Sequence, residues 1–249
     1  MNFLIGFLAG LFGGLVGLGG GIIMIPMMVG IKKLSQHQAH GTSLVVLVFT
    51  GITGAVYYYA TKGAVDFVAA GLLAVTAIFT AGKGARLAHA LPEWKLKKIF
   101  GAFIIIISLL LVLKPYIPHA ISPLGGWMKV IILLLAGALT GLISGMMGVG
   151  GGSLMVPAMV LLVGMNQHLA QGSSLLAMIP AGAVGAWTHH KLGNIQAHLL
   201  YGLIPGVISG TFFGSGIANY LPENILRFVF AVVIIWTGIH FLRAPKKTT

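Results

Sequence analysis

The sequence predicts an all-α, polytopic membrane protein, and three observations support this fold class. Of the 249 residues, 57% are hydrophobic and only 7% are charged, whereas soluble domains carry about 25% charged residues. A helix that crosses a hydrocarbon core of about 30 Å needs about 20 apolar residues, and the chain contains several runs of that length. Two of the runs are interrupted by glycine clusters, which need a structural reason at membrane depth.

Glycine, proline and charged residues delimit the apolar stretches along the chain. The stretches fall at about 2–31, 38–60, 64–82, 96–114, 127–163, 169–190, 196–219 and 223–243. The first and the fifth are longer than one crossing requires, and they contain the glycine clusters at 17–21 and 148–152. Each of the other six has the length of a single helical crossing.

The two glycine clusters belong to an internal repeat with a spacing of 131 residues, from Gly17 to Gly148. Identical pairs at this spacing include Pro26 with Pro157, Gln36 with Gln167 and Ser43 with Ser174. A deletion near residue 62 reduces the spacing by one for the remainder. The sequence therefore predicts a duplication with a first membrane repeat at 1–114, a linker at 115–126 and a second membrane repeat at 127–249.

Each glycine-broken segment is either one kinked crossing or a re-entrant hairpin. The pieces at 3–16 and 21–31 are too short to cross the membrane alone at 1.5 Å per residue, which favours hairpins, three full crossings per half and an inverted repeat. With the basic loop at 83–98 in the cytoplasm, this arrangement places 11 of the 15 lysines and arginines inside, against 8 for parallel halves. We therefore expect both termini in the cytoplasm, with a long kinked helix as the alternative.

The breaks are candidate anion-binding sites. At each break a second half-helix begins, so its first N–H groups are unpaired and its positive dipole end faces the break. Paired interruptions in matching places of two halves indicate a transporter substrate site. The candidate substrate-binding glycines are Gly19, Gly20, Gly21, Gly150, Gly151 and Gly152. The alternative is that these glycines only allow close helix packing.

Small hydroxyl residues open the segment that follows each break, where they could donate to the oxygens of an anion. They are Thr42, Ser43, Ser173 and Ser174, and they are preceded by His40 and Gln171 as further candidate ligands. Alternatively, the hydroxyls bond to a backbone carbonyl one turn earlier and need no ligand. Lys83 and Arg86 are expected at the cytoplasmic mouth, where they would raise the local concentration of anions.

The remaining polar residues are assigned to helix ends and to the membrane interface. Asp66, Glu93 and Glu223 each open a segment and are expected to cap it, so no carboxylate lies deep in the membrane and cation transport is disfavoured. The dipeptides 36–37 and 167–168, both Gln-His, are also expected at capping positions. Tyr57-Tyr58-Tyr59 is interpreted as part of an interfacial aromatic belt.

Several function classes are disfavoured by what the sequence lacks. It has no cysteine, which excludes disulfides and thiolate ligands, and its basic residues are scattered between apolar stretches rather than grouped for nucleic acid. The histidine-glutamate signature of metalloproteases is absent, and neither a serine-protease motif nor a pair of membrane aspartates is present. We therefore expect no enzyme activity, no metal site, no cofactor and no nucleic-acid partner.

The repeated G-x-G-G-G-x-x-x-x-P pattern, at 17–26 and 148–157, is followed by Ala-His-Gly-Thr-Ser at 39–43 and Ala-Gln-Gly-Ser-Ser at 170–174. Over nearly the whole chain this arrangement resembles the TauE/SafE family of sulfite-exporter-like membrane proteins. The resemblance implies transport of sulfur-containing anions, such as sulfite, sulfoacetate or another organosulfonate, across the bacterial cytoplasmic membrane, often as export. A passive anion channel and a different small anionic substrate are the alternatives. Membrane lipid is the other expected partner, and the oligomeric state, including a homo-oligomer, is left open.

Overall fold

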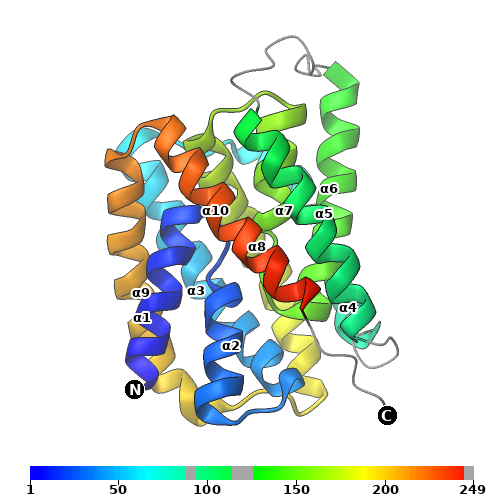
Figure 1. Ribbon diagram of the computed structural model, residues 1–249, viewed down its shortest axis with the longest axis vertical. Helices are drawn as coiled ribbons and strands as arrows, with labels where there is room; N and C mark the ends of the chain where they lie inside the picture. The colour runs from blue at the N-terminus through cyan, green and yellow to red at the C-terminus, as the bar shows by residue number, and fades with distance from the viewer. Residues whose placement is uncertain (88–92, 114–125, 244–249) are drawn as a thin grey trace.

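The protein is an elongated bundle of helices, described here from a computed structural model that covers residues 1–87, 93–113 and 126–243 (Figure 1). In chain order the elements are α1 (Asn2–Val16), α2 (Gly21–Lys32), α3 (Gln36–Lys62), α4 (Phe67–Leu87), α5 (Glu93–Leu113), α6 (Gly126–Met147), α7 (Gly152–Pro157), the π-helix η2 (Ala158–Leu162), α8 (Gln167–Lys191), α9 (Ala197–Tyr220) and α10 (Glu223–Leu242). Within the described ranges, α3, α4, α6, α8, α9 and α10 are long and apolar enough to span a membrane. The predicted all-α membrane fold is confirmed, whereas the linker at 115–126 falls almost wholly outside the described residues.

The chain reverses direction at both glycine clusters. Figure 1 shows α1 running from the N-terminal end of the molecule to its middle and α2 returning to that same end, while α6 comes from the opposite end and α7 turns back toward it. With 15 residues, α1 is about 23 Å long and too short to cross a membrane. The 22-residue α6 is long enough to cross alone, so the second broken segment has one long and one short arm. The origin of these segments by duplication stays a prediction.

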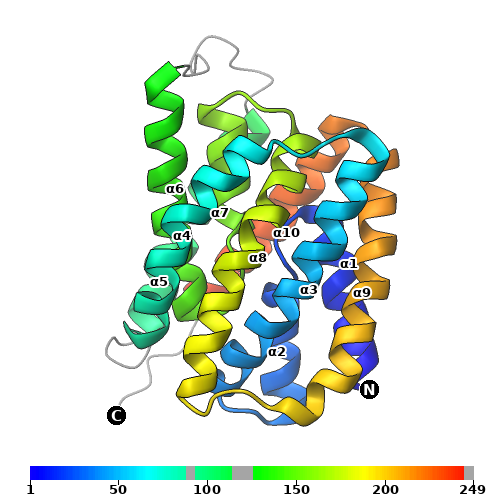
Figure 2. The ribbon, with the colours of Figure 1, turned by 180° about the vertical axis from the view of Figure 1, so that it is seen from behind.

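Helices from the two predicted repeats pack mainly against each other. The closest helix pairs are α1 with α9, α4 with α6, α3 with α8 and α5 with α10, and each pair takes one member from each repeat (Figures 1 and 2). Glycines make the closest approaches possible, because a Cβ on Gly10 of α1 would overlap the carbonyl oxygen of Val207 on α9. The predicted boundaries therefore do not outline two separately packed domains.

Basic residues gather at one end of the bundle, which we call the basic end. There α2, α4 and α8 end, as Figures 1 and 2 show, and α10 ends in the same half of the molecule but short of that end (Figure 1). The described lysines and arginines at these helix ends are Lys32, Lys33, Lys83, Arg86, Lys191 and Arg243. Those at the other end, which we call the opposite end, are Lys62, Lys129 and Arg227. This segregation agrees with the inverted arrangement, and the placement of the basic end in the cytoplasm stays a prediction.

The structure corrects two helix starts and agrees with the predicted cap at Asp66. The caps of α3 and α8 are Ser35 and Asn166, each one residue before the expected Gln-His pair, and the Ser35 hydroxyl accepts a hydrogen bond from the Gln38 N–H. Serine and asparagine are better caps because their short side chains reach the backbone N–H groups of the first turn. Asp66 Oδ1 accepts a hydrogen bond of 2.9 Å from the Ala69 N–H at the start of α4. The side chain of Glu93 lies outside the described residues.

Candidate functional site

The two glycine breaks meet in the interior of the bundle. Both use left-handed backbone, with φ of +83° at Gly19 and +89° at Gly150, a conformation that favours glycine. A Cβ on Gly21 would overlap the carbonyl oxygen of Gly148, and one on Gly152 would lie 2.9 Å from the carbonyl carbon of Gly17. The structure thus brings the predicted glycines together, with the backbone of one break resting on the backbone of the other.

Two of the predicted hydroxyls connect the breaks. The Ser43 Oγ lies 2.8 Å from the carbonyl oxygens of both His40 and Gly148, and it donates its single hydrogen to them. In the other half, the Ser174 Oγ lies 3.0 Å from the Gly17 carbonyl oxygen and 2.8 Å from that of Gln171. Each serine therefore satisfies a carbonyl where a helix of the other half of the chain ends. Neither donor hydrogen is directed at a ligand in this conformation.

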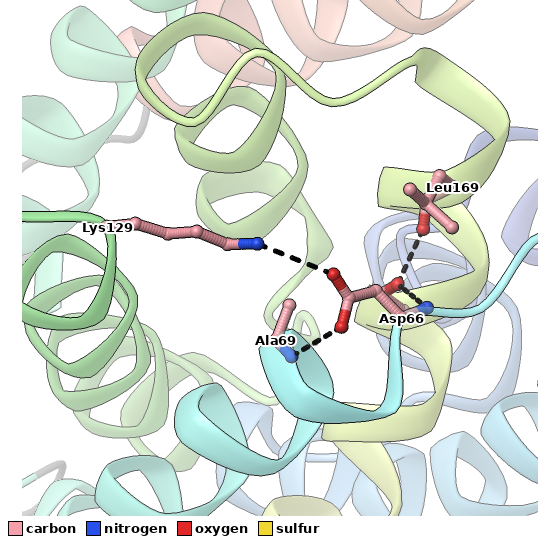
Figure 3. A network of polar contacts seen from close by, with 5 residues as sticks. Asp66, Ala69, Lys129 and Leu169 are labelled. Atoms are coloured by element: carbon pink, nitrogen blue, oxygen red, sulfur yellow. Dashed lines mark hydrogen bonds and ion pairs between the residues drawn. The ribbon is translucent and has the colours of Figure 1, made fainter. Parts of the chain in front are cut away.

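The other two hydroxyls hold the starts of neighbouring segments. Thr42 Oγ1 accepts a hydrogen bond of 3.1 Å from the Gln196 N–H. Ser173 Oγ accepts one of 2.8 Å from the Asp66 N–H and donates to the Leu169 carbonyl oxygen. Figure 3 shows this network, in which Asp66 also pairs with Lys129 at 3.6 Å. Thr42 and Ser173 thus have backbone partners of their own.

The space beside the remaining glycines is filled by protein. A Cβ on Gly20 would lie 2.9 Å from the carbonyl carbon of Ala9, one on Gly19 would lie 3.0 Å from Leu47 Cδ1, and one on Gly151 would overlap the side chain of Thr140. Close packing therefore accounts for the absence of side chains at these positions. A valine at Gly20 or Gly151 would strike the protein before it could block a ligand.

A cavity of about 330 Å³ reaches from the basic end to the breaks, between α2, the start of α3 and the ends of α6 and α10. Two predicted residues, Gly21 and His40, line it. The lining also includes Ile22, Gln36, Met147, Val149, His240 and Arg243. Because Gly21 begins the 12-residue α2, the positive end of that helix dipole faces the cavity. The positive charge of Arg243 and the helix terminus suit a small anion.

The contribution of α10 to this cavity was not predicted from the sequence. His240 and Arg243 lie one turn apart at the end of that helix, and the spacing of three places them on one face. The pattern could have indicated a basic face, but not that this face lies beside α2. Conversely, Lys83 and Arg86 are exposed on the last turns of α4 and are not among the residues lining this cavity.

A tyrosine expected at the membrane interface is part of the interior. Tyr58 is fully buried, and its hydroxyl lies 3.1 Å from the Gly14 carbonyl oxygen and 2.8 Å from Oε1 of Gln171. The belt prediction is wrong for Tyr58 because this side chain turns toward α1 and α8, whereas Tyr59 is exposed. On α8, the buried His189 makes a similar contact, with Nε2 at 3.1 Å from the Gly145 carbonyl oxygen.

An all-helical membrane fold in which two backbone breaks meet beside a cavity is the architecture of a transporter. The chain belongs to the TauE/SafE family, since the family model described as "Sulfite exporter TauE/SafE" matches residues 2–241. The family resemblance seen in the sequence is therefore confirmed, and so is the multi-pass membrane location.

Several relatives support the same class. The chain is 26% identical to "Probable membrane transporter protein YunE" of Bacillus subtilis (strain 168), covering 96% of this chain and 95% of the relative. It is 28% identical to a "Probable membrane transporter protein" of Xylella fastidiosa (strain Temecula1 / ATCC 700964), covering 96% and 91%. No solved structure matches the chain. The family and these relatives make the protein a membrane transporter.

Proposed function

We propose that the protein carries a small sulfur-containing anion, such as sulfite, sulfoacetate or another organosulfonate, out of the cell across the cytoplasmic membrane. The observation that carries this proposal is the cavity that joins the basic end to the first turn of α2 at Gly21. His40 and Gln36 supply polar groups, and the exposed Arg243 adds a positive charge to the lining. The description of the matching family model, a sulfite exporter, supports sulfur anions as the substrate class.

The charges around the cavity favour an anion with a single negative charge. None of its lining residues carries a carboxylate, and Arg243, the one arginine among them, is exposed. A helix terminus stabilises an anion by only about 0.3–2 kcal/mol, far less than the hydration that a dianion loses on entering the membrane. We therefore expect bisulfite or a sulfonate to bind better than a doubly charged form, with modest affinity.

The contact between the two breaks supports a carrier over a passive channel. A channel requires a continuous opening, whereas here the backbone at Gly21 rests on Gly148 and the backbone at Gly152 rests on Gly17. Passage through this point requires the hairpins to move, as alternating access does. Transport by a coupled carrier can also run against a concentration gradient, which a channel cannot achieve.

The proposal is tested first by thermal unfolding of the purified protein with sulfite, sulfate, thiosulfate, sulfoacetate, taurine or chloride. A ligand at 100 times its Kd should stabilise the protein by about 2.7 kcal/mol. Arg243→Gln should weaken this stabilisation at low salt, whereas Lys62→Gln, at the opposite end, should not. Flux in proteoliposomes against a gradient then tests the carrier mechanism, and inside-out vesicles test the direction. Stabilisation by none of the sulfur anions, together with no flux, would refute the proposal.

A further inference from the structure

Two glutamine side chains lie in the interior with polar atoms that have no partner. Gln167 and Gln171, one turn apart on α8, are both fully buried. Among the described residues, neither the nitrogen nor the oxygen of the Gln167 side-chain amide has a hydrogen-bond partner. The Nε2 atom of Gln171 also lacks a partner in this part of the chain. An unpaired buried amide is costly, so such groups in a native protein call for an explanation, of which an absent ligand is one.

The two amides form a line from the first break toward the opposite end. A Cβ on Gly17 would lie 2.9 Å from Cγ of Gln171, which places this side chain against the break. Gln167 lies one turn nearer the opposite end, where its backbone N–H donates to the Glu223 carboxylate at 3.2 Å. One end of the Gln171 amide lies 2.8 Å from the Tyr58 hydroxyl, which also lies 3.1 Å from the Gly14 carbonyl oxygen. The other end of this amide, like both ends of the Gln167 amide, is left without a partner among the described residues.

A second pair of polar side chains lies one turn apart on the other side of the breaks, where it lines the open cavity. Gln36 and His40 are one turn apart at the start of α3, and Ser43, which follows, bonds to the Gly148 carbonyl. Ser174 follows Gln171 in the same way and bonds to the Gly17 carbonyl. However, Gln36 is partly exposed and lines the cavity at the basic end, whereas its counterpart on α8 is fully buried.

We propose that Gln167 and Gln171 form a second binding position for the transported anion, which is closed in this conformation and opens toward the opposite end. The inference rests on the proposed function and names the place where the anion is held after it leaves the cavity at Gln36 and His40. Amide N–H groups donate to anionic oxygens without adding a charge, so the position binds the anion and still releases it. Opening requires α8 to separate from the start of α10 at Glu223.

The first test removes the amides while keeping their volume. Gln167→Met and Gln171→Met should each reduce anion flux in proteoliposomes about tenfold or more, because a hydrogen bond to a charged partner is lost. Their melting temperatures without anion should stay unchanged or rise, because a methionine at these positions has no unpaired polar atom and the Tyr58 hydroxyl can still donate to the Gly14 carbonyl oxygen at 3.1 Å. Thr237→Val is the matched control, since it removes a buried hydroxyl that bonds to the Val233 carbonyl of α10, away from the site. Normal flux in both methionine variants, or a loss of flux that only follows a fall in melting temperature, would overturn the proposal.

The second test uses the absence of cysteine from the chain, which makes a cysteine introduced at position 36 or 167 the only thiol. A negatively charged, membrane-impermeant methanethiosulfonate should modify Gln36→Cys from the side of the basic end and Gln167→Cys only from the opposite side. Sulfoacetate should slow both reactions, and it is chosen because sulfite itself attacks thiosulfonates.

The outcomes separate this inference from the proposed function. If the parent protein moves no sulfur anion but the two cysteines react from opposite sides, the substrate assignment fails and the two-sided access on which this inference depends is retained. If the parent moves sulfur anions while Gln167→Cys is active and unreactive from both sides, the second position does not exist and the substrate assignment stands.

Discussion

Gly21 offers a sharp test of whether the two breaks are in contact. A Cβ at this position would lie 2.9 Å from the carbonyl carbon and oxygen of Val149 and would overlap the carbonyl oxygen of Gly148. These are backbone atoms that cannot rotate away. Overpacking of an interior costs about 1–3 kcal/mol, and we expect Gly21→Ala to lie at the upper end of this range because both hairpins must shift.

Gly30 in the same helix provides the matched control, since no atom lies within 4 Å of a Cβ built there. Gly30→Ala should leave stability unchanged or raise it by about 0.5–1 kcal/mol, because alanine restricts the unfolded chain. At about 2–4 °C per kcal/mol for a chain of this size, the melting temperatures of the two variants in detergent should differ by about 6 °C or more. Equal melting temperatures would refute the contact between the breaks.

Three further predictions follow from the hydrogen bonds and the charges. Ser43→Ala and Ser174→Ala should each lower the free energy of unfolding by about 1 kcal/mol, and an unchanged denaturation midpoint would mean that the carbonyls find other partners. A reporter fused after Thr249 should be active only in the cytoplasm, and periplasmic activity would contradict the orientation. Joint replacement of Lys83 and Arg86 by glutamine should slow anion flux at low ionic strength and not at high, because exposed charges are screened. Loss at every salt concentration, in a folded protein, would place the pair in the site.

Features encoded by neighbouring residues were predictable from the sequence. The glycines at 17–21 and 148–152 allow a left-handed backbone that ends one helix and begins another, so the breaks follow from local chemistry. The length and hydropathy of each apolar stretch likewise predicted the membrane helices. The π-helix η2 was not predicted; it follows Pro157, whose missing N–H and bulky ring disturb the regular hydrogen-bond pattern of the helix.

The cavity and the partners of the serines depend on contacts between distant parts of the chain. Sequence spacing placed Ser43 near a break, but its bond to Gly148 is fixed only when α3 packs beside α6. Arg243 is one of the basic residues that the predicted topology places in the cytoplasm. Its role in the cavity could not be predicted, because nothing local indicates that the end of α10 lies beside α2. Tyr58 was misassigned for a similar reason: three adjacent tyrosines look alike in sequence, and only the packing of α3 decides which one faces inward.

The hydrogen bonds of Ser43 and Ser174 join the two halves of the chain, and this affects the order in which the protein can fold during synthesis. Ser43 and the carbonyl that it binds are 105 residues apart, and Ser174 and its carbonyl are 157 residues apart. When the first half of the chain leaves the ribosome, its break therefore lacks the serine that will satisfy it, and its own serine has no distant carbonyl to bind. We therefore expect the first break to reach its final structure only after the second half of the chain has been synthesised. Separately expressed halves should accordingly be short-lived alone and should persist only when both are present in the same membrane.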